Sequence, residues 1–468
     1  MIISSWGWHY SLIASVAIIL TSSMIFGADS QEIEVVEQSQ NTDIQLSYQP
    51  SEAAYGQIFK ENIQSAVANH PRTAAAIALR DSFRFREREA KASLYPTLDV
   101  GISGRYRMAD NFENRFDNIT ERSQRDTSAH ASVTGRQLLF DGGQTSSYVR
   151  SSKHSFTAAH EEYSQMASAI ALLAVEIHFQ VIFQRQRQQL YQDIIADHRN
   201  TRDKVKLRFE SGRGPERDVA LLESRLALVE ADSLSVRKNL EETISQYEEI
   251  YGFLPETLKR PELALNIPDS LDGALELGFQ NNPSLSIAHS MTLASKADMS
   301  AEKADQLPHL SMELAATKYD LDRGNSDYDV TGRLVMNYNL YSGGATTARI
   351  SRSRKDYERA RHEEINAHRR VTREIKVAFQ NIAPQGSRVL ALKKATEASK
   401  RNSEQLLLQF EATGGSLLSL LEARKEHYQA REQYLAALIE KDILRFRLLD
   451  AVGILNNMLN IRLSKARE

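Results

Sequence analysis

Hydrophobic residues along this chain follow two periods, one typical of helices and the other typical of strands. Helical periodicity is continuous over residues 144–211 and 345–413, and each stretch is followed by a glycine-rich tip and a second helix, at 216–251 or 416–452. The first stretch would be roughly 100 Å long at 1.5 Å per residue. A helix of that length cannot bury its apolar face in a small core. The pattern therefore predicts antiparallel helical hairpins that pack in a coiled coil or a ring.

Shorter helices are predicted ahead of each long one, and within each pair an Asn and a Pro separate the two helices. The pairs are 55–68 with 72–94, and 271–279 with 284–306. Proline suits a first helical turn because the amide hydrogen that it lacks would have no helical partner there. Pro384, by contrast, lies inside the second long stretch, where a kink or a short break is expected.

In four further segments apolar and polar residues alternate, as they do in a strand whose two faces meet different surroundings. Each strand is predicted to be about 10–14 residues long, which is enough to cross a membrane at a tilt. Two half-buried hairpins of a soluble sheet would give the same pattern, so the alternation alone leaves both interpretations open. The alternating residues of these strands lie within 97–106, 132–139, 309–317 and 330–340.

The order of these elements occurs twice. Leu139-Phe140-Asp141-Gly142-Gly143 is echoed 201 positions later by Leu340-Tyr341-Ser342-Gly343-Gly344, and Asn69-His70-Pro71 is echoed at an offset of 212 by Asn281-Asn282-Pro283. The difference of 11 residues is placed in the polar loop 111–126, which is longer than its counterpart at 320–327. We therefore expect an internal two-fold repeat, with a first repeat at 51–260, a second at 261–456 and a tail at 457–468.

Composition removes several classes of function. The chain has 468 residues, a net charge of −3 and no Cys, so disulfides and thiolate metal sites are excluded and no general attraction to nucleic acid is expected. His362 and His368 are six positions apart, a spacing that does not place both rings on one helix face. His178 is expected in the interior or facing a pore. Without a phosphate-binding loop or a nucleophile motif, we expect no enzyme, no cofactor and no metal.

The N-terminus carries an apolar run over residues 12–26. This run is short for a membrane-spanning helix and suits the core of a signal peptide, so 1–28 is predicted to be a signal peptide, with an uncleaved anchor as the alternative. Residues 29–50 are acidic and rich in Gln and Ser, and a flexible lead is expected there.

Four strands cannot close a membrane barrel, since single-chain barrels begin near eight strands. An open sheet edge in lipid would leave backbone groups unpaired, at a cost of several kcal/mol each. If the strands span a membrane, the barrel must therefore be shared between subunits.

The chain resembles the TolC family of outer-membrane channel proteins, over nearly all of residues 55–455. The resemblance is carried by the repeated features above, together with Leu94-Tyr95-Pro96 and the tips Phe209-Glu210-Ser211-Gly212 and Phe410-Glu411-Ala412-Thr413-Gly414. It implies a mainly α fold in which each of three protomers contributes four strands to a 12-strand outer-membrane barrel, continued by a periplasmic α-helical barrel. It also implies a passive exit duct for efflux or type I secretion that works with a periplasmic adaptor protein and an inner-membrane transporter.

The resemblance also suggests functional residues. The hairpin tips, where family members dock the adaptor, correspond to Gly212, Arg213, Gly214, Gly414 and Gly415. Candidates for a pore constriction are Glu422 and, where a second acid can occur, Ser419; the first half offers Asp218 and Glu223. Each acid could equally be a solvated residue of a helix face. Expected junctions between the barrel and the helices are Pro96, Gly142, Gly143, Pro308, Gly343 and Gly344.

Two questions stay open at this point. An envelope coiled-coil scaffold or periplasmic adaptor, with small soluble sheets, is the alternative to a channel. For a channel, secretion of a protein and efflux of small molecules are nearly equal possibilities, with a slight preference for secretion.

Overall fold

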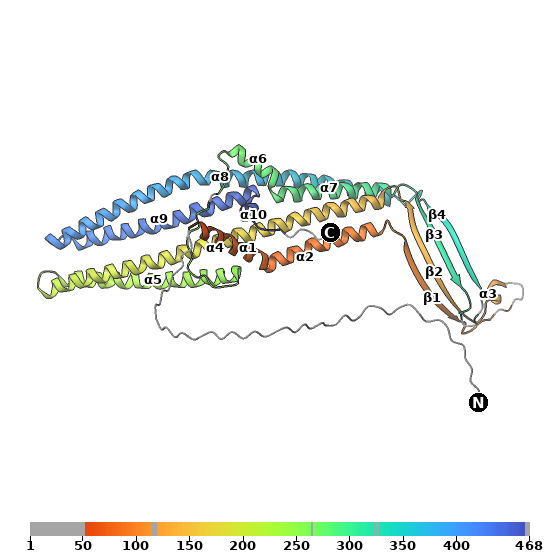
Figure 1. The fold of residues 1–468 in the computed structure, drawn as a ribbon, viewed down its shortest axis with the longest axis horizontal. Coiled ribbons are helices and arrows are strands. Elements are labelled where there is room, and N and C mark those ends of the chain that lie inside the picture. Colours follow the sequence, from red (N-terminus) through yellow and green to blue (C-terminus); the bar gives the residue numbers. More distant parts are fainter. Residues whose placement is uncertain are drawn as a thin grey trace, which may run out of the picture. The chain divides into compact units, whose positions relative to one another are not determined.

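The structure, a computed structural model of the whole chain, describes residues 52–463 apart from 112, 114–118, 264, 322–323 and 325–326. The predicted signal peptide (1–28) and lead (29–50) lie outside the described residues. Each half contains two shorter helices, two strands and a long helical hairpin in that order, while α3 and α10 have no counterpart in the other half (Figure 1). The elements are α1 (Glu52–Asn69), α2 (Pro71–Ala92), β1 (Thr97–Tyr106), α3 (Ile119–Ser123), β2 (Thr127–Phe140), α4 (Gln144–Glu210), α5 (Glu216–Tyr251), α6 (Leu271–Asn281), α7 (Pro283–Ala304), β3 (His309–Lys318), β4 (Tyr328–Asn337), α8 (Ala345–Thr413), α9 (Leu417–Val452) and α10 (Leu455–Met458).

The four strands form one antiparallel sheet in the order β1-β2-β3-β4, which confirms the predicted strands. Their lengths are 10, 14, 10 and 10 residues. The register pairs Thr97 with Arg136 and His309 with Asn337, and a bulge interrupts the pairing of β2 with β3 near Leu138. All ten residues of β1 are exposed, so the sheet has no hydrophobic core on either face there. β1 and β4 are open edges.

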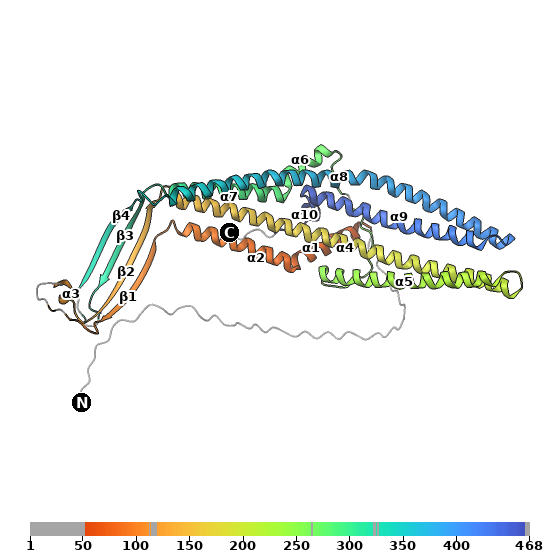
Figure 2. The same ribbon diagram turned by 180° about the vertical axis from the view of Figure 1, so that it is seen from behind.

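The longer helices lie side by side (Figures 1 and 2). Next to the sheet their order is α2, α4, α7, α8, and towards the hairpin tips it is α5, α4, α9, α8. The two long helices therefore run through both parts. α2 and α5 form one flank of the chain, and α8 forms the other.

The largest core lies at mid-length, where α1 and α10 pack against α4, α5 and α9. Phe59, Phe179 and Phe446 pack together with ring centroids about 6 Å apart, in the range favourable for aromatic pairs. The buried ring of His178 lies 4.7 Å from that of Phe59, and its Nε2 is 3.2 Å from the carbonyl oxygen of Lys259. His178 is thus an interior residue, one of the two positions expected for it.

The Asn-Pro element ends one helix and begins the next. The side chain of Asn282 accepts a hydrogen bond from the amide of Ser284 (2.9 Å) and donates one to the carbonyl of Ala451 in α9 (2.8 Å). This places α9 against the same joint, where Gly453 has φ +84° and a Cβ would lie 2.4 Å from the carbonyl oxygen of Asn281. Only glycine fits both the backbone conformation and the close approach.

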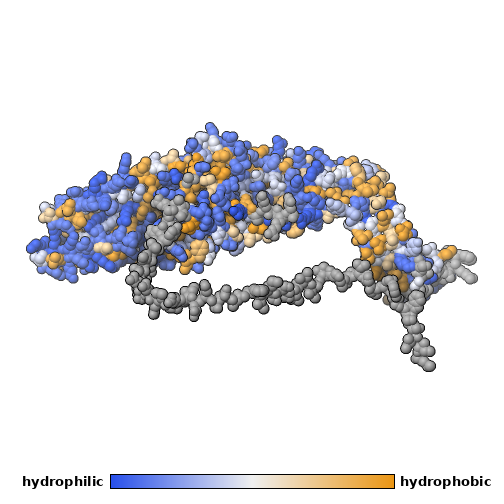
Figure 3. Space-filling model, in the orientation of Figure 1, coloured by the Kyte–Doolittle hydropathy of each residue, from blue (hydrophilic) through white to orange (hydrophobic). Residues whose placement is uncertain are grey.

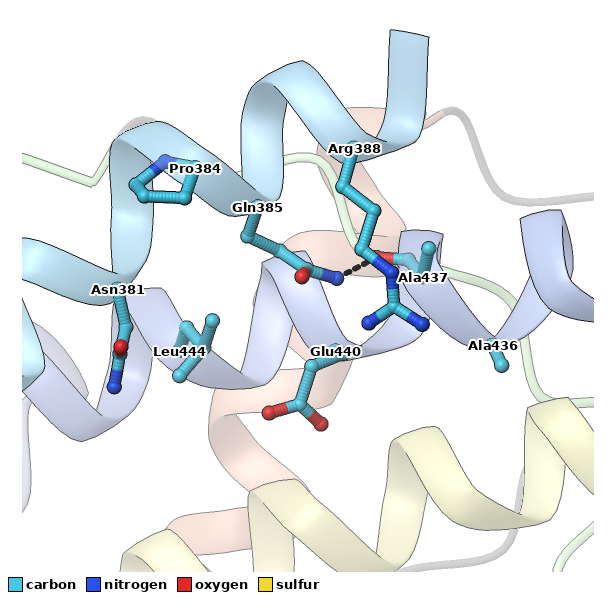
Figure 4. A pocket seen from close by; sticks show the side chains of 8 residues that line it. All are labelled: Asn381, Pro384, Gln385, Arg388, Ala436, Ala437, Glu440 and Leu444. Carbon is cyan, nitrogen blue, oxygen red and sulfur yellow. Dashed lines mark hydrogen bonds between the residues drawn. The ribbon is translucent and has the colours of Figure 1, made fainter. Parts of the chain in front are cut away.

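Pro384 does not break α8, which is one helix of 69 residues. A proline removes one helical hydrogen bond, here the bond to the carbonyl of Gln380, and neighbouring contacts can compensate for that loss. Gln385 supplies such a contact, since its Nε2 donates to the carbonyl of Ala437 in α9 at 2.8 Å. Figure 4 shows this bond beside a cavity of about 530 Å³ that Arg388 and Glu440 also line.

Candidate functional site

The sheet has one apolar and one polar face, and the register explains why. Val100, Val133, Ala316 and Val330 are paired in one row across all four strands. A second row runs through Thr97, Arg136, Glu313 and Arg333, and Glu313 forms an ion pair with Arg333 at 3.0 Å. Apolar surface is concentrated over the strands in Figure 3, whereas the helices are mostly hydrophilic. A sheet with lipid on one side and water on the other has this arrangement.

Aromatic side chains gather where the strands meet the helices. Phe140 and Tyr338 are about half exposed, and Tyr95 and Tyr341 are exposed by 69 % and 86 %. Aromatic residues at the end of an apolar band are typical of the boundary between a membrane and water. The pattern of apolar and polar residues did not reveal this group, although Tyr95 and Tyr341 lie inside the repeated motifs.

The predicted junction residues lie at the turns between sheet and helices. Pro96 directly precedes β1 and Pro308 directly precedes β3. Each Gly-Gly pair follows a strand and has φ values near +65° and +85°, a combination that side chains other than glycine rarely adopt. The values are +65° and +84° at Gly142 and Gly143, and +65° and +87° at Gly343 and Gly344.

The hairpin tips lie at the end of the helices away from the sheet (Figure 1). Gly212 and Gly414 have φ values of +70° and +73°, and a Cβ on either would meet open space. Arg213 is exposed, and its amide closes the first tip by donating to the carbonyl of Arg208 (2.8 Å). The other predicted tip residues, Gly214 and Gly415, complete the two turns.

Arg208 joins the two tips within one protomer. Its guanidinium lies 4.5 Å from the centre of the Phe410 ring and donates to the carbonyl of Phe410 at 2.9 Å. Lys204 adds an ion pair of 2.6 Å with Glu411. The free ends of the two hairpins are therefore held together by α4 and α8.

The four predicted constriction residues lie near the tips but not in one cluster. Ser419 and Glu422 are exposed in the first two turns of α9, whereas Asp218 and Glu223 belong to α5. Glu422 borders a groove of about 320 Å³ between α4, α5 and α9. Neither Asp218 nor Glu223 lines that groove. Among the described residues of one protomer, the carboxylates thus stay separate, and a ring of acids requires several copies.

A polar seam between α4 and α9 was missed by the sequence analysis. Arg424 is buried, lies 3.1 Å from the carboxylate of Asp197 and donates to the hydroxyl of Thr201 at 2.5 Å. The hydroxyl of Tyr428 also donates to Asp197, and burial together with that carboxylate raises the pKa of Tyr428 well above its ordinary value. The sequence does contain a sign of this seam, because polar residues recur at an interval of four on both helices: Asp197 and Thr201 in α4, and Arg424 and Tyr428 in α9.

No three His, Asp and Glu side chains of the described residues are arranged to hold a metal ion. Among the described helices α4 alone is long and apolar enough to cross a membrane, and most of its apolar stretch is buried against its neighbours.

Known proteins resemble this chain in sequence and in fold. Residues 62–250 and 275–453 match the family described as outer membrane efflux protein. TolC of Salmonella enteritidis is 22 % identical over 421 residues, which cover 84 % of this chain and 81 % of that protein. The outer membrane efflux protein BepC of Brucella suis is 21 % identical over 330 residues, covering 70 % and 72 %.

Solved structures share the fold. The CmeC outer membrane channel of Campylobacter jejuni superposes with a TM-score of 0.75 at 14 % identity, over 91 % of this chain and 94 % of that one. A membrane protein from Pseudomonas aeruginosa gives 0.77 at 15 % identity, over 84 % and 90 %.

These matches define the class as outer-membrane channel proteins with a mainly helical body and a small sheet. The chain belongs to the outer membrane efflux protein family, the family that includes TolC, and its place is the outer membrane. The predicted resemblance and the predicted mainly α fold with four strands are confirmed.

Proposed function

We propose that this protein is the outer-membrane exit duct of a tripartite export system and that it works as a homotrimer. The observation that carries the proposal is the sheet, which is uncovered on both faces, open at both edges, and divided into an apolar and a polar side. Such a sheet is unfavourable in water and cannot close by itself in lipid.

Closure between copies follows from the strand order. Because neighbouring strands are antiparallel throughout, β4 of one copy is antiparallel to β1 of the next when the two edges pair. Three copies would give twelve strands, an even number within the range of bacterial barrels. The apolar row at Val100 would then face lipid, and the row at Glu313 would face the water-filled interior.

The helices would continue this barrel as a tube in the periplasm. Their tips, far from the sheet, would be the surface that an adaptor protein contacts. The proposed docking residues are Gly212, Arg213, Gly214, Gly414 and Gly415. An inner-membrane transporter would supply the energy. Conduction would be passive, and we assign the protein no catalytic step.

Near the tips, the predicted carboxylates would line the narrow part of the pore. In a three-fold ring each of Glu422, Asp218 and Glu223 occurs three times, and carboxylates around a narrow neck attract cations. Ser419, one turn from Glu422, adds no charge. The ring proposed here is therefore less acidic than one in which that position also carries a carboxylate.

The alternative, an envelope scaffold or adaptor, predicts a sheet that is stable in water. The exposed apolar row on β1 and β4 argues against it, since soluble proteins rarely expose large apolar patches. The test is the detergent-corrected mass of the protein extracted from outer membranes. About three times the mass of the mature chain supports the channel. A monomer that is soluble without detergent supports the scaffold.

The cargo can be a protein or a small molecule, and relatives of both kinds occur. PrtF of Dickeya chrysanthemi, named a protease secretion protein, is 25 % identical over 236 residues, which cover 48 % of this chain and 51 % of that protein. BepC is named an efflux protein. Deletion of the gene separates the two cases: loss of a secreted protein from the medium indicates secretion, and increased sensitivity to toxic compounds indicates efflux.

A further inference from the structure

The polar face of the sheet carries a row of three charged side chains across three neighbouring strands. The register pairs Arg136 of β2 with Glu313 of β3, and Glu313 with Arg333 of β4. Of the Asp, Glu, Lys and Arg residues on this face of the strands, these three lie nearest to the helices. We call them the charged row.

One carboxylate serves two guanidinium groups in the charged row. Arg333 donates to both carboxylate oxygens of Glu313, at 3.0 Å and 3.3 Å. Arg136 lies 4.0 Å from the same carboxylate on the other side. A single negative charge cannot neutralise two positive charges, so the row keeps an excess of positive charge.

The two kinds of charge are not equally accessible. The side chains of Arg136 and Arg333 are 59 % and 66 % exposed, whereas that of Glu313 is 14 % exposed. A solute that approaches this part of the sheet therefore meets guanidinium groups before it meets the carboxylate.

Other acids near the charged row lie at different levels of the sheet. Successive rows on one face are two residues, or about 7 Å, apart. The register places Asp99 one row and Asp329 two rows farther from the helices. On the helix side, Asp141 is 8 % exposed, and its carboxylate accepts hydrogen bonds from two backbone amides of the junction, at 2.9 Å and 2.6 Å. The excess of positive charge is therefore local to the level of the charged row.

We propose that the charged row forms a cationic ring at the mouth of the barrel, where cargo passes from the helical tube into the membrane, and that this ring binds carboxylate or phosphate groups of the cargo in passage. The inference rests on the proposed trimeric barrel, in which each copy contributes two guanidinium groups and one carboxylate to the ring. Rings of Arg or Lys favour anions in pores, and the planar guanidinium matches carboxylate and phosphate. The ring thus has the opposite sign to the carboxylates proposed near the tips.

A purely structural role makes a different prediction. Cross-strand ion pairs stabilise the pairing of strands whatever passes along the pore. In that case the electrostatic potential in the pore would not depend on the charged row. The experiment therefore measures the local potential rather than stability.

The test places one thiol beside the charged row. The natural chain has no Cys, so Ser311→Cys supplies a single reactive group, on the same face and one row nearer to the helices. Two thiosulfonate reagents of similar size are compared, one carrying a sulfonate and the other a quaternary ammonium group. The quantity measured is the ratio of their rates, anionic over cationic, in the reconstituted protein.

Opposite changes are expected when charges of either sign are removed. R136Q/R333Q should lower the rate ratio about threefold or more, because the attraction for the anionic reagent is lost. Glu313→Gln should raise the ratio, because it removes the one carboxylate of the row. The single variant Arg333→Gln should lower the ratio as well, and it keeps the test open if the double variant does not assemble.

Two matched controls accompany these variants. Arg105→Gln removes a cation of the same face, eight residues along β1 from the end that pairs with Arg136, or roughly 27 Å away. At that distance salt screens the charge, so the rate ratio at Ser311→Cys should stay unchanged. Leu314→Cys lies on the apolar face of the same strand and should react with neither reagent.

The outcomes separate this inference from the proposed function. A rate ratio that stays the same in R136Q/R333Q and Arg333→Gln, or that moves in the same direction when Glu313 is replaced, would overturn the cationic ring and leave the trimeric channel intact. If Leu314→Cys reacts and Ser311→Cys does not, the polar face does not line a water-filled interior. The proposed barrel then fails, and the ring fails with it.

Discussion

Arg424 of α9 and Asp197 of α4 form an ion pair of 3.1 Å that joins the two hairpins of one protomer. The side chain of Arg424 is 7 % exposed, whereas that of Asp197 is 33 % exposed. The charge of Arg424 is thus shielded from water. It is balanced by the ion pair with Asp197, and the guanidinium also donates a hydrogen bond to Thr201. This pair holds the tip halves of α4 and α9 side by side.

Replacement of Arg424 by Met should destabilise the protein by about 1–3 kcal/mol, because Asp197 loses its cation and Thr201 loses its donor. The lower part of that range is expected, since Asp197 can regain water. Heat denaturation in detergent, followed by circular dichroism, measures the change. Arg199→Met is the matched control: its 2.7 Å pair with Glu230 is exposed on both sides and should contribute less than about 1 kcal/mol. Equal losses in the two variants would contradict this account.

Gly142→Ala and Gly343→Ala test the two junctions with the same change at the same φ of +65°. At Gly343 the new methyl group meets open space, so only backbone strain of about 1–2 kcal/mol is expected. At Gly142 it would lie 2.6 Å from Cδ1 and 2.8 Å from Cβ of Leu307, which adds roughly 1–3 kcal/mol of overpacking. The yield of folded protein and its heat stability should fall further for Gly142→Ala, and the reverse order would refute the packing argument.

His178 should make stability depend on pH. Burial lowers its pKa from 6.5 to about 4, so the folded protein keeps the ring neutral where the unfolded chain protonates it. The folded state therefore binds fewer protons between these values, and stability is highest above pH 6.5 and falls towards pH 4. Between pH 7 and pH 5 the contribution of this ring is about 2 kcal/mol.

The variant His178→Leu isolates this effect. It loses the contacts with Phe59 and Lys259 at every pH, but its stability should fall less than that of the natural protein between pH 7 and pH 5. Heat denaturation at both pH values gives the comparison. An identical fall in both proteins would show that other groups cause the pH dependence.

Glu422→Gln tests the proposed constriction. Three carboxylates would leave the ring, so the preference for cations over anions should decrease in planar bilayers under a salt gradient. Ser419→Asp should increase the same preference by adding three carboxylates one turn away. A reversal potential that neither change moves would place these residues outside the narrow part of the pore.

The sequence by itself determined the elements and their order. The change from a period of 3.6 to a period of 2 located the strands, and the repeated Gly-Gly and Asn-Pro motifs located the bends, because these depend on local backbone preferences. For strands that span a membrane, it also implied sharing of the sheet between copies, since four strands are too few to close.

Only the tertiary structure decided which distant residues meet. The row from Val100 to Val330 depends on strand register. The pairing of Arg424 with Asp197 and the bond from Gln385 to α9 beside Pro384 depend on how α9 aligns with its neighbours. Local preferences fix elements, whereas contacts between elements far apart in the chain depend on packing, which a one-dimensional pattern does not specify.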